Sequence, residues 1–270
     1  MSKTLTPTRA PAGTALLNVG AGMHASPEWT NLDLVDAPHV VRHDIRRGLP
    51  FAPATFDAVY ASHVLEHLTP ADGEGLVAEM RRVLKRGGIL RLAVPDLERT
   101  ARAYLERLER ADGADDPCYR WIKLELLDQL VRDRSGGLML RALREGTVDP
   151  QDVSERIGDE LLEAIDATPD GDGSSSSGLR ASVLSTRAGR RLRAFLLDRR
   201  DPRRLGEVHR WMYDRVDLVA LLRRHGFSDA ARTTFDVSRI PGWERYRLDS
   251  TPDGSRPRKP DSLFVEASLG

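Results

Sequence analysis

Two short apolar runs are separated by a glycine-rich turn, and the second run carries a carboxylate. Residues 15–35 read ALLNVGAGMHASPEWTNLDLV, with Gly20 and Gly22 in the turn and Asp33 in the second run. Glycine has no Cβ, so this backbone can lie close to a ligand at the carboxyl end of the first strand, where open α/β sheets bind ligands. Asp33 falls at the tip of the second strand, where a carboxylate can accept hydrogen bonds from both ribose hydroxyls.

The spacing around this turn disfavours a dinucleotide. The dinucleotide fingerprint needs a third glycine, and the chain has Ala25 in that region. About ten residues separate Val19 from Thr30, which is short for a helical crossover, so we expect a first helix that is a stub or is missing. Few free N–H groups would then face a pyrophosphate. With Asp44 near the end of a third strand, the pattern indicates a nucleoside without pyrophosphate, such as S-adenosylmethionine.

Histidines and a further carboxylate follow at strand ends. The segment SHVLEHL contains His63, where a fourth strand ends, and His63 could shape the site or act as a base. Its other histidine, His67, is spaced for a metal pair on a helix, but this segment is expected at a turn out of a strand, so we expect no metal. We expect His67 to cap or pack in the helix.

Two more candidates lie near the return to the sheet and after the fifth strand. His209, in EVHRWMYD, is the first choice as base or acceptor-binding residue, and its alternative role is to dock a helical insert. Asp96 follows Pro95 at a strand end and could bind an acceptor hydroxyl or amine.

Four segments, in this order and spacing, resemble the class I S-adenosylmethionine-dependent methyltransferases. They read LNVGAG, NLDL, HDIRRGLPFAPATFDAVYASHVLEHL and EMRRVLKRGGILRLAVPD. The resemblance covers roughly residues 14–100 and 207–270 and is to a subgroup with a short first helix, similar to methyltransferase type 11 domains. This subgroup is often linked to sugar, polysaccharide or secondary-metabolite pathways.

The resemblance implies a Rossmann-like α/β sandwich with a seven-stranded, mostly parallel sheet, one antiparallel strand near its edge, and a helical insert. The cofactor's methionine end would lie over residues 20–22, its ribose on Asp33 and its adenine beside Asp44 and Ile45. The family often has an acidic residue where this chain has Asn18, whose amide can still accept a hydrogen bond. The predicted cofactor-binding residues are Asn18, Gly20, Ala21, Gly22, Asp33, Leu34, Asp44, Ile45, Ser62 and His63.

The elements that must position these residues follow from hydrophobic patterning. Strands are predicted at 14–19, 30–35, 55–64 and 87–96, with a helix at 69–88 that ends at a Gly-Gly pair. The last two strands should be parallel with a right-handed crossover. A helix at 214–227 and closing strands at 231–237 and 262–269 complete the sheet.

The middle of the chain has a different pattern. Helical spacing recurs at 97–110, 119–133, 154–167 and 183–200, and a Gly/Ser-rich stretch at 168–179 indicates a mobile loop. We therefore expect a flexible lead at 1–13, a methyltransferase core at 14–100 and 207–270, and a helical insert at 101–206. The insert would act as a lid and acceptor-binding wall.

Composition sets limits on partners and location. The 270 residues include 41 basic and 41 acidic side chains, so nucleic acid is not an expected partner. The single cysteine, Cys118, cannot form an internal disulfide and fits a reducing cytoplasm. The N-terminus lacks the apolar core of a signal peptide, and no run approaches a membrane span, so we expect a cytoplasmic protein without membrane contact.

The sequence thus predicts an enzyme that methylates an oxygen or nitrogen of a small molecule and releases S-adenosylhomocysteine, with candidate catalytic residues His209, His63 and Asp96. One alternative is a nucleotide-binding oxidoreductase or epimerase. Another is a non-catalytic protein that keeps the fold. The acceptor is open, and a homodimer is compatible with the sequence.

Overall fold

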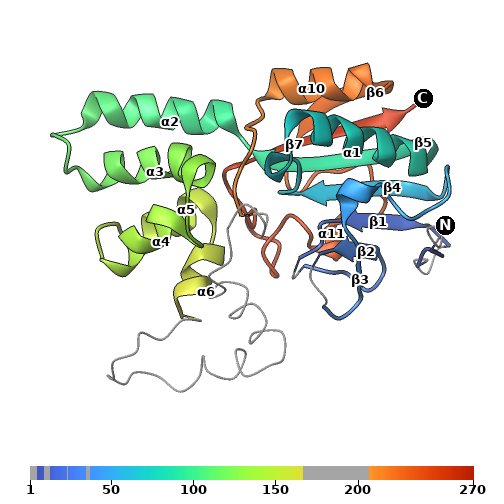
Figure 1. Ribbon diagram of the computed structural model, residues 1–270, viewed down its shortest axis with the longest axis horizontal. Helices are drawn as coiled ribbons and strands as arrows, with labels where there is room; N and C mark the ends of the chain where they lie inside the picture. Colours follow the sequence, from blue (N-terminus) through green and yellow to red (C-terminus); the bar gives the residue numbers. More distant parts are fainter. Residues whose placement is uncertain (1–4, 9–12, 23, 35–36, 167–206) are drawn as a thin grey trace. The chain divides into compact units, whose positions relative to one another are not determined.

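The computed structural model describes residues 5–8, 13–22, 24–34, 37–166 and 207–270 (Figure 1). Contacts divide the chain into two compact units, the first made of 1–98 with 210–270 and the second of 99–209. Each unit is described by itself below.

A seven-stranded sheet in the order β3-β2-β1-β4-β5-β7-β6 forms the centre of the first unit. Strand β7 runs antiparallel to both β5 and β6, while β1 to β5 pair in parallel. This arrangement confirms the predicted α/β sandwich with a mostly parallel sheet. The strands are β1 (Leu16–Val19), β2 (Thr30–Asp33), β3 (Val40–Arg42), β4 (Phe56–Ser62), β5 (Leu84–Pro95), β6 (Phe227–Thr233) and β7 (Ser262–Leu269).

The connection from β1 to β2 has no helix in the part that the structure describes, which is all of it except residue 23. The expected short crossover is therefore confirmed for these residues. The next helix of the sandwich, α1 (Pro70–Val83), begins at Thr69, whose hydroxyl accepts the N–H of Asp72. It ends before the predicted Gly-Gly stop because β5 already begins at Leu84.

Successive side chains of each strand point to opposite faces of the sheet, so the hydrophobic core has two parts, one on each face. One face packs Leu17, Val59 and their neighbours against α1 and α10 (Arg215–Arg224). The other face packs Tyr60 with Trp29 and the short helix α11 (Trp243–Tyr246). The second face is thus an aromatic cluster rather than an aliphatic one.

One closing strand differs from expectation. In the lead, Leu5 packs partly buried against the core, and its N–H donates to the carbonyl of Pro50 at 2.8 Å. The flexibility of 1–13 stays a prediction. The predicted strand at 231–237 is β6, which begins earlier, at Phe227.

The second unit is helical. It contains α2 (Leu97–Arg110), whose first two residues belong to the first unit, and then α3 (Pro117–Val131), α4 (Gly137–Arg144), α5 (Pro150–Ile157) and α6 (Glu160–Asp166). The segment predicted as one helix at 154–167 is two helices, because α5 ends at Gly158 with a φ of 87°. The predicted loop at 168–179 and helix at 183–200 lie outside the described residues.

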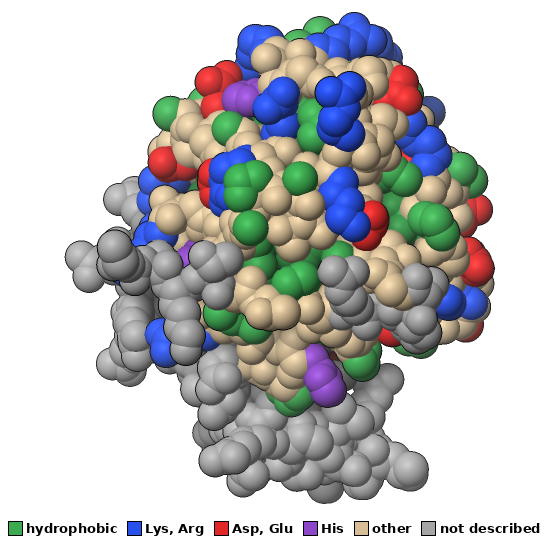
Figure 2. Space-filling view, turned by 90° about the vertical axis from the view of Figure 1, so that its right-hand side faces the viewer, with side chains coloured by type: hydrophobic (Ala, Val, Ile, Leu, Met, Phe, Trp, Pro, Cys, Tyr) green, Lys and Arg blue, Asp and Glu red, His purple; other side chains and the backbone are tan. Residues whose placement is uncertain are grey.

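The helices of the described ranges include none that is long and apolar enough to cross a membrane. On the face shown in Figure 2, Lys and Arg side chains are interspersed with Asp and Glu, as the balanced composition leads one to expect.

Candidate active site

The glycine turn leaves β1 directly and folds over the end of β2. The N–H groups of Gly20 and Ala21 both donate to the carbonyl of Leu32, at 2.8 and 3.0 Å. Gly20 and Gly22 have φ values of 73° and 52°, in the left-handed region that favours glycine. A Cβ on Gly20 would meet Val64 Cγ2 at 2.3 Å, whereas nothing lies within 4 Å of a Cβ on Gly22. Packing therefore requires the first glycine, and the second leaves open space beside its backbone.

Asp33 connects this turn to β2. It is the last residue of β2, and its Oδ2 accepts the N–H of Gly22 at 2.8 Å. A carboxylate has about four acceptor positions, so one N–H does not use up its capacity. The structure therefore places Asp33 beside the open side of the turn, where a ribose could be bound.

Asn18 holds the turn through hydrogen bonds of its side chain. The side chain is buried, and its Nδ2 donates to Asn31 Oδ1 at 3.0 Å and to the carbonyl of His24 at 3.3 Å. Its amide N–H groups are thus used within the protein. A cofactor contact from Asn18 would have to come from its carbonyl oxygen.

The predicted adenine side is formed by a short 3-10 helix, Ile45–Arg47, after β3. Asp44 caps this helix and makes a two-pronged ion pair with Arg46, both N–O distances being 2.9 Å. Hydrogen bonding from Arg46 lowers the pKa of Asp44, which keeps the carboxylate charged. Ile45 packs against the core, and Leu34 is exposed.

His63 follows Ser62 at the end of β4 and is held on both sides of its ring. Its φ is 53°, and its N–H donates to the carbonyl of Ala93 at 2.8 Å. Nε2 lies 2.8 Å from Ser262 Oγ, and Nδ1 lies 3.0 Å from Glu66 Oε1. The ring is thus positioned by residues from two distant parts of the chain.

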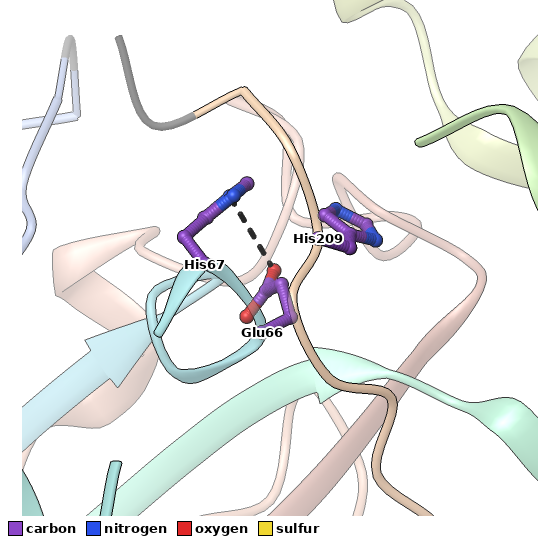
Figure 3. Close-up of side chains that lie close together, drawn as sticks. All are labelled: Glu66, His67 and His209. Atoms are coloured by element: carbon purple, nitrogen blue, oxygen red, sulfur yellow. Dashed lines mark ion pairs between the residues drawn. The ribbon is translucent and has the colours of Figure 1, made fainter. Parts of the chain in front are cut away.

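Glu66 is fully buried on the turn after β4, beside His67 (Figure 3). Neither carboxylate oxygen has a well-aligned hydrogen bond among the described residues, and His67 Nε2 is 3.9 Å from Oε1. Burial raises the pKa of Glu66 to about 8. Sequence reasoning assigned no role to this residue, although a carboxylate three positions after His63 in an apolar segment was an available signal.

Asp96 follows β5 and is buried. Its N–H donates to the carbonyl of Asp261 at 2.8 Å, and its Oδ2 lies 3.4 Å from an Arg232 nitrogen. The carboxylate therefore already has a cationic partner. An acceptor hydroxyl or amine would have to share it.

His209 belongs to the second unit. Its N–H donates to the carbonyl of Gln129 on α3 at 2.9 Å, and its Nε2 lies 2.9 Å from Gln129 Nε2. These contacts describe how His209 is anchored in the helical unit. Its role as a base stays a prediction.

Sheet order brings the other candidates to one edge. The carboxyl ends of β1, β2, β4 and β5 carry the glycine turn, Asp33, His63 and Asp96, and these ends share an edge because the strands are parallel. Ser262 joins them because antiparallel β7 starts there, opposite Pro95. Sequence reasoning did not select Ser262.

Part of the chain is similar to known methyltransferases. Residues 18–92 match the family model described as a methyltransferase domain. An uncharacterized methyltransferase of Synechocystis sp. is 34% identical over 79 residues, which cover 29% of this chain and 36% of that protein. The chain thus matches little more than a third of the relative's length.

Solved structures with low identity were also found. An S-adenosylmethionine-dependent methyltransferase of Mesorhizobium loti is 14% identical with a TM-score of 0.39, over 98% of this chain and 93% of that one. The 1,6-didemethyltoxoflavin-N1-methyltransferase of Burkholderia thailandensis is 13% identical with a TM-score of 0.39, over 97% and 72%. Residues 18–92 are thus similar to a methyltransferase domain, and they contain β1 to β4 and most of β5 of the seven-stranded sheet.

Proposed function

We propose that the protein transfers a methyl group from S-adenosylmethionine to an oxygen or nitrogen of a small molecule. The observation that carries the proposal is the open backbone at Gly22 with Asp33 bonded to it at 2.8 Å. When bound, the cofactor supplies a methyl group on a positively charged sulfur, which leaves with the bond's electron pair as the new bond forms. The protein's contribution is then chiefly orientation and exclusion of water.

The residues present fit such a cofactor. The space above Gly22 admits a ligand where a Cβ would intrude, and Asp33 can accept hydrogen bonds from ribose hydroxyls. In the described part of the β1–β2 connection no helix offers its N-terminus to a pyrophosphate, which favours S-adenosylmethionine over NAD.

Other assignments are part of this proposal. Asp44 and Ile45 would flank the adenine, Asp96 would contact the acceptor, and His63 or His209 would take its proton. The second unit would bind the acceptor, a sugar or secondary metabolite, and the reaction would occur in the cytoplasm.

Isothermal titration with S-adenosylhomocysteine and NAD in parallel tests the proposal. We expect binding of the first alone, and Asp33→Ala should weaken it by about 1.5–3 kcal/mol, the worth of a charge-assisted hydrogen bond. Asp33→Asn, which keeps an oxygen for the Gly22 N–H, separates ribose binding from support of the turn. Glu74→Gln, an exposed carboxylate on α1, is the matched control.

Binding of NAD without S-adenosylhomocysteine would favour the oxidoreductase alternative. Binding of S-adenosylhomocysteine with unchanged affinity in Asp33→Ala would remove Asp33 from the site. Binding of neither would leave a fold without this chemistry.

A further inference from the structure

Three side chains, two from the turn after β4 and one from the start of β7, lie in a row. Ser262 Oγ lies 2.8 Å from His63 Nε2, and His63 Nδ1 lies 3.0 Å from Glu66 Oε1. Ser262 is 199 residues from His63 in the sequence. Both ring nitrogens of His63 therefore meet a group that can give or take a proton.

The backbone at His63 is in an unfavourable conformation. A φ of 53° is uncommon for a residue with a side chain, and it persists only where the surroundings fix it. Here the Ala93 carbonyl, at 2.8 Å from the His63 N–H, fixes the backbone, and Ser262 and Glu66 fix the ring. Such strain is concentrated at functional sites.

Glu66 is difficult to explain as a purely structural residue. A fully buried carboxylate normally has several hydrogen-bond donors, and no well-aligned donor faces Glu66 among the described residues. The titratable groups that act on it are His63, His67, Lys259, Asp261 and Tyr213. Lys259 favours the charged carboxylate and Asp261 opposes it, so no single cation holds the charge in place.

We propose that Ser262, His63 and Glu66 act as a proton chain that deprotonates the methyl acceptor, with the Ser262 hydroxyl as the catalytic group that contacts it. The inference rests on the proposed function and deepens it. The acceptor's O–H or N–H gives its proton to Ser262 Oγ while the serine proton passes to His63 Nε2. The resulting imidazolium is stabilised by the Glu66 carboxylate, so His63 holds the proton and Glu66 positions it.

The position of Ser262 supports this direction of transfer. It begins β7 opposite Pro95, at the sheet edge that carries the glycine turn two strands away from β5. His63 follows the last residue of β4, the strand between β1 and β5. The chain therefore lies at the edge where the methyl group would be presented. It also indicates the acceptor class: a molecule with a hydroxyl or N–H to deprotonate, rather than a thioether.

The test follows the His63 nitrogens by NMR in protein labelled with ¹⁵N-histidine, between pH 5 and 9. We expect Nδ1 to carry the proton in the neutral ring, with Nε2 accepting a hydrogen bond from the Ser262 hydroxyl. Saturating S-adenosylmethionine should lower the pKa of His63 more than saturating S-adenosylhomocysteine, by about half a unit or more, because only the former has a positive sulfur. No acceptor is needed for this measurement.

Variants sharpen the assignment. In wild type the His63 resonances should shift a second time as Glu66 ionises near pH 8, and Glu66→Gln should abolish this second step. Ser262→Ala should shift the Nε2 resonance and leave S-adenosylhomocysteine affinity unchanged. Ser268→Ala, on the same strand, is the matched control and should leave the His63 resonances unaltered.

Each outcome decides the matter. Equal His63 pKa values with the two cofactors, both bound, would overturn the proton chain and leave the proposed function standing. His63 resonances that titrate identically in wild type and Glu66→Gln up to pH 9 would overturn it as well. Failure of both cofactors to bind would overturn the proposed function itself. If Glu66→Gln does not fold, the comparison of the two cofactors in the wild-type protein still tests the proton chain.

Discussion

Two charged groups are buried in the first unit on neighbouring parts of the sheet, and their surroundings differ completely. Arg91 in β5 is fully buried, and each guanidinium nitrogen donates a hydrogen bond; its partners are Asp249, Glu266 and the carbonyls of Thr234, Phe235 and Val237. Glu66, just beyond β4, is equally buried but has no aligned donor among the described residues. A satisfied buried charge holds a structure together, whereas an unsatisfied one indicates chemistry.

The group around Arg91 has a clear structural task. Its guanidinium lies 4.4 Å from the ring centre of Trp243, and its bonds to Asp249 and to the carbonyls before Trp243 tie residues 234–249 onto the aromatic face. Tyr60 completes the cluster by donating to Asp249 Oδ1 at 2.5 Å. We call Arg91, Asp249, Glu266, Tyr60 and Trp243 the Arg91 cluster.

The largest expected effect is on the Arg91 cluster. Arg91→Leu should lower the free energy of unfolding by about 3–5 kcal/mol, because the buried Asp249 loses the cation it is bonded to and Glu266 keeps only Arg239. Arg86→Leu, at an exposed position on the same strand, should change it by less than about 0.5 kcal/mol. Urea unfolding measures both. A loss below about 1 kcal/mol for Arg91→Leu would show that the cluster is not structural.

The second prediction is that burial of Glu66 makes the free energy of unfolding fall as pH rises. The folded-state pKa of Glu66, about 8, lies above its ordinary value of 4.5, so the folded protein holds this proton more tightly than the unfolded chain. The resulting stability is complete below pH 4.5 and is lost as pH rises to about 8. Wild type should therefore lose stability relative to Glu66→Gln by up to about 1.4 kcal/mol per pH unit across this window.

Urea unfolding of both proteins at several pH values checks the second prediction. A constant difference between pH 4.5 and 8 would contradict it and would show that the pKa of Glu66 in the folded protein is not raised.

The smallest effects should come from removing one hydroxyl from the Arg91 cluster and one from the proton chain. Tyr60→Phe takes a donor from a buried charged carboxylate and should cost about 1.5–3 kcal/mol. Ser262→Ala removes a neutral partner from His63 and should cost about 0.5–1.5 kcal/mol. Thermal unfolding of the two variants gives the ranking. A larger loss of stability in Ser262→Ala than in Tyr60→Phe would show that the proton chain, and not the Arg91 cluster, is the group that stabilises the fold.

The sequence was informative where the signal is local. The apolar runs predicted the sheet. The glycines of the turn and the short spacing to Thr30 predicted a first helix that is a stub or is missing, and the described residues of that connection contain none. The end of α1 was misplaced because β5 begins before the Gly-Gly pair. Helix α4 was missed because it is short and begins at Gly137, a poor helix former.

Long-range pairing explains what sequence reasoning missed at the site. Ser262 reaches His63 only because β7 runs antiparallel and begins at the edge where β4 ends. Arg91 reads as a polar interruption of an apolar strand, and its side-chain partners lie 158 and 175 residues away. No local sequence pattern predicts the contact of Ser262 with His63 or the contacts of Arg91 with its carboxylates. The adjacent His63 and Glu66 were visible, but the burial of Glu66 depends on tertiary packing.

The two points where the chain leaves and re-enters the first unit adjoin each other. Asp96 forms a parallel bridge with Tyr213, and the N–H of Leu97 donates to the Tyr213 carbonyl at 3.1 Å. A short linker could close this gap at little cost in loop entropy, without moving a strand of the sheet. The helical segment is therefore a cassette in the engineering sense. It could be excised or exchanged between related proteins while the sheet and its glycine turn stay unchanged.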